Sequence, residues 1–324
     1  MFRVSRAWKE VGDDPVLWRD VRVKIPSRSS QFLAEIINTS RLKLVRELRL
    51  EQCVSAKNAD SVLRLIINHG QIESLDISGN KLSLVDTRTL AKLTQKLRKL
   101  RAESCRLTHQ QVETILRVVD EGDEARLRTL LIGNNNLSGI KSDNLGRTAC
   151  KLSSFHCDNS RLSPRHLTNL LTAIKDQGEP SQLLELNLMQ NSLLEIHHTL
   201  IAAALTNIKS INLWGTNAIC LSLLSEIAAG RSRIEKLNLG SSDFSYYPPG
   251  LVANAVIRLK EVDLSHVRMS SLALNMILTT ISTSEDCQLE SLTMLNVTQS
   301  SASVEQLVQQ VQDKIARFEF SFMV

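Results

Sequence analysis

The sequence predicts an α/β solenoid, an elongated array in which short parallel strands alternate with helices. Residues 183–193 read LLELNLMQNSL, with leucines at 183, 186, 188 and 193 placed around Asn191. A closely similar pattern recurs along the chain at intervals of 25 to 31 residues. Between the copies, apolar residues recur at helical spacing. A unit of this length buries its apolar face only by stacking on its neighbours, so we expect one array instead of several globular domains.

The pattern of residues 183–193, L-x-x-L-x-L-x-x-N-x-L, resembles the strand and asparagine turn of a leucine-rich repeat. The resemblance implies a horseshoe with parallel strands on its concave face and helices on its convex face, because helices are wider than strands. Units of strand, turn and helix are similar to the ribonuclease-inhibitor-like and F-box-associated classes of this repeat.

One apolar residue of each copy, which opens the L-x-L segment, serves as a marker. Side chains alternate along a strand, so both apolar residues of L-x-L are expected to face the helices while the residues beside them face outward. The markers are Leu48, Leu75, Leu100, Leu130, Phe155, Leu186, Ile211, Leu237, Val262 and Leu292, with Phe318 as an eleventh.

The segments between the markers predict the helices and turns. Helical spacing of apolar residues is found in 61–67, 110–119, 166–174, 198–205 and 221–228. Side chains five residues after the marker should satisfy backbone groups in the turn: Asn80, Asn135 and Asn191, with Cys53, Cys105, Ser160, Thr216 and Ser242 at the equivalent place. Val267 and Val297 cannot do so, and the last repeats are therefore expected to turn differently.

The formal charge of +5 over 324 residues is concentrated at the start of the chain. Residues 1–50 hold eleven Lys or Arg against six Asp or Glu. A reader of nucleic acid would usually show a longer basic stripe with interleaved aromatic residues, so we expect a solvated basic end or an acidic partner, and no nucleic acid. No apolar run reaches membrane-spanning length, and residues 1–14 do not fit a signal peptide, which favours a cytoplasmic or nuclear protein without membrane contact.

Residues 4–8 read VSRAW and residues 13–18 read DDPVLW. Together they resemble the closing half of an F-box, whose usual ending is V-C-R-x-W, a short gap and D-P-x-L-W. Ser5 replaces the usual Cys, and the opening half with its L-P-x-E has no counterpart in these residues. The resemblance assigns adaptor docking to Val4, Arg6, Trp8, Pro15, Leu17 and Trp18. It divides the chain into an F-box-like helical cap over 1–25 and a repeat array over 26–324.

In the F-box family, this motif docks on the Skp adaptor of cullin ubiquitin ligases, and the missing half makes much of that contact. The resemblance therefore implies a substrate-recognition subunit that holds a target protein on the repeats and has no active site of its own. The alternative is a leucine-rich-repeat interaction scaffold without a ligase link, in which Trp8 and Trp18 only cap the first repeat.

No motif for catalysis, a cofactor or a metal is present. The adjacent His197 and His198 would diverge by about 100 degrees on a helix and could not share a metal. The cysteines lie far apart and are read as reduced thiols, several of them at core positions: Cys53, Cys105, Cys150, Cys157, Cys220 and Cys287. We expect no enzyme and no cofactor.

The outward strand positions are the candidate target-binding surface. Met189 and Trp214 occupy one column on neighbouring strands, about 4.8 Å apart, and are expected to form an exposed anchor. Leu131 and His156 extend this patch one column over, with Asn187 and Asn212 beside it. The alternative is that Trp214 lies flat on its neighbours and binds nothing.

Overall fold

The computed structural model describes residues 19–22, 43–69, 71–122, 126–178, 182–297 and 302–322. The predicted adaptor-docking residues Val4, Arg6, Trp8, Pro15, Leu17 and Trp18 lie outside these ranges, and so does the predicted domain boundary at residues 25 and 26. The chain divides into two compact units, Met1–Asn144 and Leu145–Val324, called unit 1 and unit 2 below.

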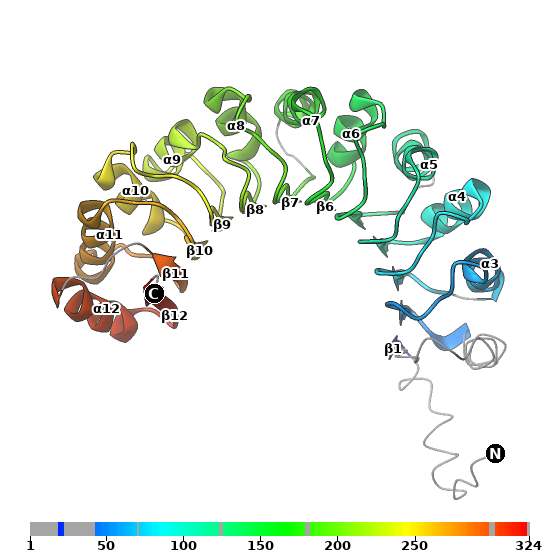
Figure 1. The fold of residues 1–324 in the computed structure, drawn as a ribbon, viewed down its shortest axis with the longest axis horizontal. Coiled ribbons are helices and arrows are strands. Elements are labelled where there is room, and N and C mark those ends of the chain that lie inside the picture. Colours follow the sequence, from blue (N-terminus) through cyan, green and yellow to red (C-terminus); the bar gives the residue numbers. More distant parts are fainter. Residues whose placement is uncertain are drawn as a thin grey trace, which may run out of the picture. The chain divides into compact units, whose positions relative to one another are not determined.

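Unit 1 contains a parallel sheet in which consecutive strands are neighbours. Its strands are β1 (Asp20–Arg22), β2 (Glu47–Arg49), β3 (Ser74–Asp76), β4 (Lys99–Arg101) and β5 (Thr129–Leu131). Helices α3 (Ala59–His69), α4 (Thr87–Lys96) and α5 (His109–Glu121) connect them and lie on one side of the sheet (Figure 1). The chain passes into unit 2 within α6 (Ser142–Cys150).

Unit 2 repeats the same plan with strands β6 (Ser154–His156), β7 (Glu185–Asn187), β8 (Ser210–Asn212), β9 (Lys236–Asn238), β10 (Glu261–Asp263), β11 (Ser291–Val297) and β12 (Arg317–Phe322). All neighbouring pairs are parallel. The helices are α7 (Pro164–Gln177), α8 (His198–Leu205), α9 (Leu221–Ala228), α10 (Pro249–Val256), α11 (Ser271–Thr283) and α12 (Ala302–Lys314). They lie on one side of the strands (Figure 1). The five predicted helical segments and the predicted strand at Phe318 are confirmed.

The marker residues form the core that the strand pattern predicts. Within each unit, successive markers are paired in register, as in Leu48 with Leu75 and Leu186 with Ile211. The ten markers from Leu48 to Leu292 are all buried. Removing a large apolar side chain from water stabilises a fold by about 1.5–3 kcal/mol, so each buried marker contributes to the stability of its unit.

The turn asparagines satisfy the backbone as predicted. Asn191 is 1% exposed; its Nδ2 donates to Cys157 O at 2.9 Å and Leu188 O at 3.1 Å, and its Oδ1 accepts from the N–H groups of Ser160 and Leu162, each at 3.3 Å. Asn80 and Asn135 make the same kind of bonds in unit 1. One buried side chain thereby joins two consecutive repeats.

The smaller residues at this position satisfy fewer groups. The thiol of Cys105 donates to Ile77 O at 3.1 Å, and the hydroxyl of Thr216 donates to Leu213 O at 2.8 Å. At Val267 the expected difference is wrong: His266 keeps the positive φ of Ser241, and Arg268 pairs with Asp243, the equivalent residue of the preceding repeat. At Val297 the repeat does differ, since β11 continues as far as this residue.

One backbone feature was not predicted from the sequence. The residue four positions after every marker from Leu48 to Leu292 has a positive φ. Only two of these ten residues are glycines, Gly79 and Gly215; the others include Gln52, Gln190 and His266. The repeat therefore imposes the left-handed conformation even on side chains that disfavour it.

Among the described residues, no helix is both long enough and apolar enough to cross a bilayer.

Candidate polar groove on the strand face of unit 2

The outward side chains of β6 to β12 form the strand face of unit 2, which carries a groove of about 290 Å³. Its lining comes from the residues on either side of each marker, while the markers themselves are buried beneath it. The side chains that line it are His156, Glu185, Asn187, Ser210, Asn212, Lys236, Asn238, Glu261, Asp263, Ser291 and Thr293. All of these side chains are polar, so a bound molecule would meet hydrogen-bonding and charged groups.

The residues directly after the markers are held in a fixed orientation by one repeated hydrogen bond. Their side-chain oxygen accepts from the backbone N–H two residues later: Asn187 from Met189 and Asn212 from Trp214, each at 3.0 Å, and Asn238 from Gly240 and Asp263 from Ser265, each at 2.9 Å. These backbone groups lie where the strand ends and would otherwise lack a protein acceptor. These hydrogen bonds orient the side chains without replacing the backbone hydrogen bonds between strands.

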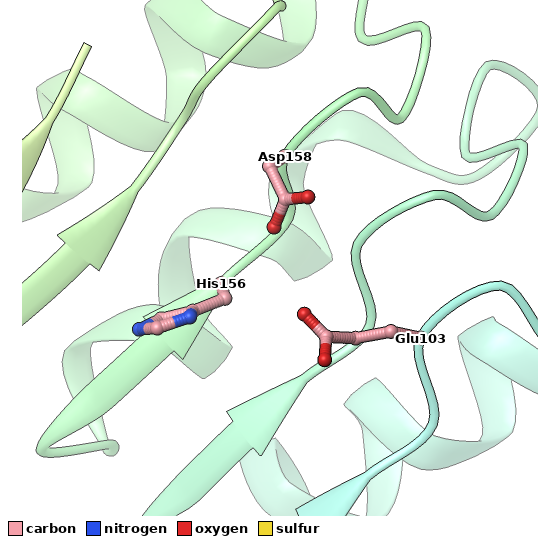
Figure 2. Close-up of side chains that lie close together, drawn as sticks. All are labelled: Glu103, His156 and Asp158. Atoms are coloured by element: carbon pink, nitrogen blue, oxygen red, sulfur yellow. The ribbon is translucent and has the colours of Figure 1, made fainter. Parts of the chain in front are cut away.

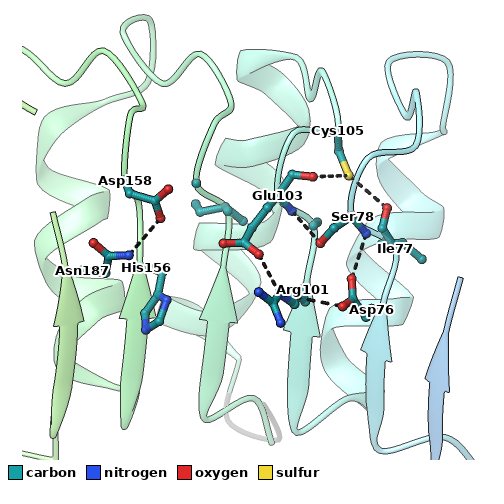
Figure 3. A network of polar contacts seen from close by, with 12 residues as sticks. Asp76, Ile77, Ser78, Arg101, Glu103, Cys105, His156, Asp158 and Asn187 are labelled. Carbon is teal, nitrogen blue, oxygen red and sulfur yellow. Dashed lines mark hydrogen bonds and ion pairs between the residues drawn. The ribbon is translucent and has the colours of Figure 1, made fainter. Parts of the chain in front are cut away.

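Lateral hydrogen bonds join this row at both ends. Asn187 Nδ2 donates to Asp158 Oδ1 at 3.2 Å, and Asn238 Nδ2 donates to Asp263 Oδ2 at 2.9 Å. Figure 3 shows the bond between Asn187 and Asp158. In the middle of the row, Asn212 Nδ2 has no acceptor among the described residues. The network therefore leaves one amide donor on the groove wall available to a bound molecule.

The hydrogen bond from the backbone N–H two residues later also occurs in unit 1, where Asp76 Oδ1 accepts from Ser78 N at 2.9 Å (Figure 3). There the row is charged, since Arg101 lies 3.7 Å from the Asp76 carboxylate and donates to Glu103 at 2.6 Å. These charged side chains of unit 1 are therefore paired with one another.

His156 lies at the end of β6, and Asp158 follows two residues later (Figure 2). The His156 ring meets Ser154 Oγ at 3.3 Å and Glu185 Oε1 at 3.2 Å, and Ser154 Oγ donates to Glu185 Oε2 at 2.8 Å. A nucleophilic triad needs the serine and the carboxylate on opposite ring nitrogens, whereas here both meet Nε2. The arrangement joins β6 to β7 and has no geometry for activating Ser154.

The structure brings three of the six predicted target-binding residues together, because His156, Asn187 and Asn212 all line the groove. The expected exposed anchor of Met189 and Trp214 is corrected: both side chains are half-buried. A Cβ atom on Gly240 would lie 2.6 Å from Trp214 Nε1, so the indole lies over Gly240, the residue at its own position in the next repeat. The absence of a side chain there lets the ring leave water.

Leu131 is also corrected. It was expected to extend the exposed patch, but it is only 7% exposed at the end of β5 in unit 1. Its neighbour in register on β4 is the charged Arg101, and an apolar side chain on such a face packs down onto the sheet to leave water. The groove residues Lys236, Asn238 and Asp263 occupy outward strand positions, as the sequence predicts, but they were not singled out as a patch. The signal for Asn238 and Asp263 was the recurrence of Asn or Asp directly after the marker in consecutive repeats.

The cysteines are free thiols, several of them with raised pKa values. Burial raises the pKa of Cys105 and of Cys220 to about 12, and it raises the pKa of Cys53 to about 11. Burial also raises the pKa of Cys157, which lies at a core position as predicted. A thiol that stays protonated near neutral pH is a weak nucleophile, so these cysteines act as packing residues.

No family model matches the chain, and no curated protein matches it. Solved structures do match. A chain of the yeast Rad7–Elc1 complex gives a TM-score of 0.52 at 13% identity, covering 98% of this chain and 90% of that one. The leucine-rich-repeat-containing protein LegL7 of Legionella pneumophila gives 0.51 at 15% identity, covering 91% and 98%. An internalin, inlF, of Listeria monocytogenes gives 0.51 at 14% identity, covering 88% and 86%. The chain has the leucine-rich-repeat fold.

Proposed function

We propose that this chain is a non-catalytic protein-binding scaffold that holds a target protein on the strand face of unit 2. The groove carries this proposal, because it presents oriented amides, hydroxyls and charges on a rigid row of strands. Preorganised polar groups bind with a smaller loss of conformational entropy than flexible ones. The similarity of this fold to solved leucine-rich-repeat structures also supports a protein-binding role.

A photo-crosslinking experiment tests this role without knowledge of the target. p-Benzoylphenylalanine is placed at Ser210, inside the groove, and in a matched control at Ala203, an exposed residue of α8. After irradiation in cells, we expect proteins bound covalently at position 210 and absent at position 203. The same proteins at both positions, or none at position 210, would contradict binding in the groove.

We propose further that the scaffold is the substrate-recognition subunit of a Skp–cullin–F-box ubiquitin ligase, acting in the cytoplasm or nucleus. The resemblance of residues 4–18 to the end of an F-box supports it. The fold similarity to a chain of the Rad7–Elc1 complex is compatible with a scaffold that works inside a larger assembly. In such a complex this chain would position a target near an enzyme held elsewhere, and it would perform no chemistry itself.

The adaptor contact is tested by capture of the purified Skp adaptor with the chain, in this form and in any longer natural form. We expect the double substitution Trp8→Ala and Trp18→Ala to lower capture at least tenfold, because aromatic anchors dominate such interfaces. Ser210→Arg serves as a control, since it alters the groove alone. If the wild-type chain captures no adaptor in either form, the second candidate applies: an interaction scaffold with no ubiquitin-ligase link.

A further inference from the structure

The groove on unit 2 is acidic as well as polar. Its lining contains three carboxylates, Glu185, Glu261 and Asp263, against one ammonium, Lys236, which gives a net charge of −2 with His156 neutral. A cleft of one sign attracts ligands of the opposite sign and repels ligands of the same sign. This balance disfavours the phosphates of a nucleic acid and favours a basic protein segment.

The internal contacts of unit 2 neutralise part of this charge. Lys236 Nζ lies 2.7 Å from Glu261 Oε1, so the one ammonium in the groove already has a partner. The carboxylate of Glu185 meets the ring of His156 at 3.2 Å. Asp263 differs from both, because its two oxygens accept hydrogen bonds from Ser265 N and Asn238 Nδ2 but meet no cation among the described residues. Each oxygen keeps a second lone pair for a further donor.

Asp263 and the unpaired amide of Asn212 lie two strands apart, on β10 and β8. Strands are about 4.8 Å apart, so the two groups are separated by roughly 10 Å across the groove. An extended peptide covers this distance in about three residues at ~3.3 Å each. The two groups are also chemically complementary to a peptide: an amide N–H recognises a backbone carbonyl, and a carboxylate recognises a basic side chain.

We infer that the groove receives an extended basic segment of the target protein. In this arrangement Asn212 Nδ2 donates to a backbone carbonyl, and an Arg or Lys about three residues along meets Asp263. The inference rests on the proposed binding role of the strand face, and it adds the chemical class of the target segment.

The chain offers a conservative substitution for the test. Asparagine stands at the position of Asp263 on β7, β8 and β9, where Asn187, Asn212 and Asn238 make the same bond to the backbone N–H two residues later. Asp263→Asn therefore removes the charge and keeps the bond that orients the side chain, while an amide nitrogen replaces the oxygen that accepts from Asn238 Nδ2. Glu195→Gln, at an exposed position outside the groove, removes one carboxylate from unit 2 and is the matched control.

The probes are three fluorescein-labelled nine-residue peptides with Ser and Gly at most positions and either Arg, Ser or Glu at every third position. Fluorescence anisotropy gives their affinity for the full chain at low and at moderate salt. We expect the Arg peptide to bind at least tenfold more tightly than the Ser and Glu peptides, and more weakly as salt rises. Asp263→Asn should reduce this affinity about tenfold and Glu195→Gln should leave it unchanged, with thermal unfolding showing that both variants are folded at the temperature of the assay.

Equal affinity for the three peptides, or an unchanged affinity after Asp263→Asn, would overturn the inference. Tighter binding of the Glu peptide or of a single-stranded oligonucleotide would overturn it as well. Such results would not by themselves contradict the proposed function. If proteins still crosslink at position 210, the groove binds a target of different chemistry.

Discussion

The indole of Trp214 lies over Gly240, in the space that a side chain at that position would fill. The two residues occupy the same position in consecutive repeats, each two residues after the end of its strand. The contact converts a tryptophan that the sequence places on the outward face into a half-buried packing residue. Its role in binding a target stays a prediction, whereas its role in packing can be measured directly.

Gly240→Ala should destabilise unit 2 by about 1–3 kcal/mol, because the new methyl group must displace the indole and would lie 3.0 Å from Ser265 O. Chemical unfolding monitored by circular dichroism measures the loss. Combining Gly240→Ala with Trp214→Ala should cost less than the sum of the two single changes, since the ring no longer resists the methyl group. Strict additivity would show that the ring does not pack on Gly240.

Asn191→Ala should lower the free energy of unfolding by about 2–4 kcal/mol, because it leaves buried carbonyl and N–H groups from two repeats without partners. Thermal unfolding of the purified variant tests this. Asn254→Ala, at an exposed residue of α10 in the same unit, is the control and should change stability by less than about 0.5 kcal/mol. Similar losses for both variants would refute the structural role of the turn asparagine.

Gly79→Ala and Gly215→Ala should both destabilise, by about 1 kcal/mol or more, because both glycines have a positive φ. Gly79→Ala should cost more, since its Cβ would lie 2.5 Å from Gln52 Cγ, whereas the nearest atom to a Cβ on Gly215 is Gln190 Cγ at 3.6 Å. Gln190→Gly, at φ 58, should be neutral or slightly stabilising. A clear loss for Gln190→Gly would mean that the glutamine side chain makes a contact that outweighs the backbone strain.

Stability should fall as pH rises above about 9. Burial raises the pKa of the Cys105 thiol from 9.0 to about 12, so the folded chain keeps a proton that the unfolded chain releases. This contribution is fully present below the unfolded pKa and is lost as pH rises toward the folded pKa. Cys105→Ser keeps a donor for Ile77 O but does not titrate in this range. Between pH 9 and 10.5, the free energy of unfolding should fall by about 1–2 kcal/mol less in this variant than in the wild type, as measured by urea unfolding.

Other buried groups should add to this loss of stability at high pH, because burial also raises the pKa values of Cys220 and Tyr247 to about 12. The decline should therefore persist in part in the Cys105→Ser variant. An identical slope in the two proteins would show that the Cys105 thiol ionises without opposing the fold.

The repeat itself was predictable from the sequence. The spacing of Leu186 and Leu188 sets which side of a strand faces the helices, and Asn191 sets the turn, because both are local consequences of alternation and hydrogen bonding. The strand register and the helix positions followed from these residues. The positive φ after each strand escaped prediction, since Gln52, Ser104 and Gln190 give no local signal for it.

By itself, the sequence determined which residues of this protein face inward. Only the tertiary structure decided what the outward residues do. Asn212 and Asp263 come to line one groove, and Trp214 reaches Gly240, through contacts between repeats that lie 25 residues or more apart in the chain. The physical reason is that burial of an apolar side chain is dictated by its own chemistry and its place in the strand, whereas the environment of a surface side chain depends on which residues the stacking brings beside it.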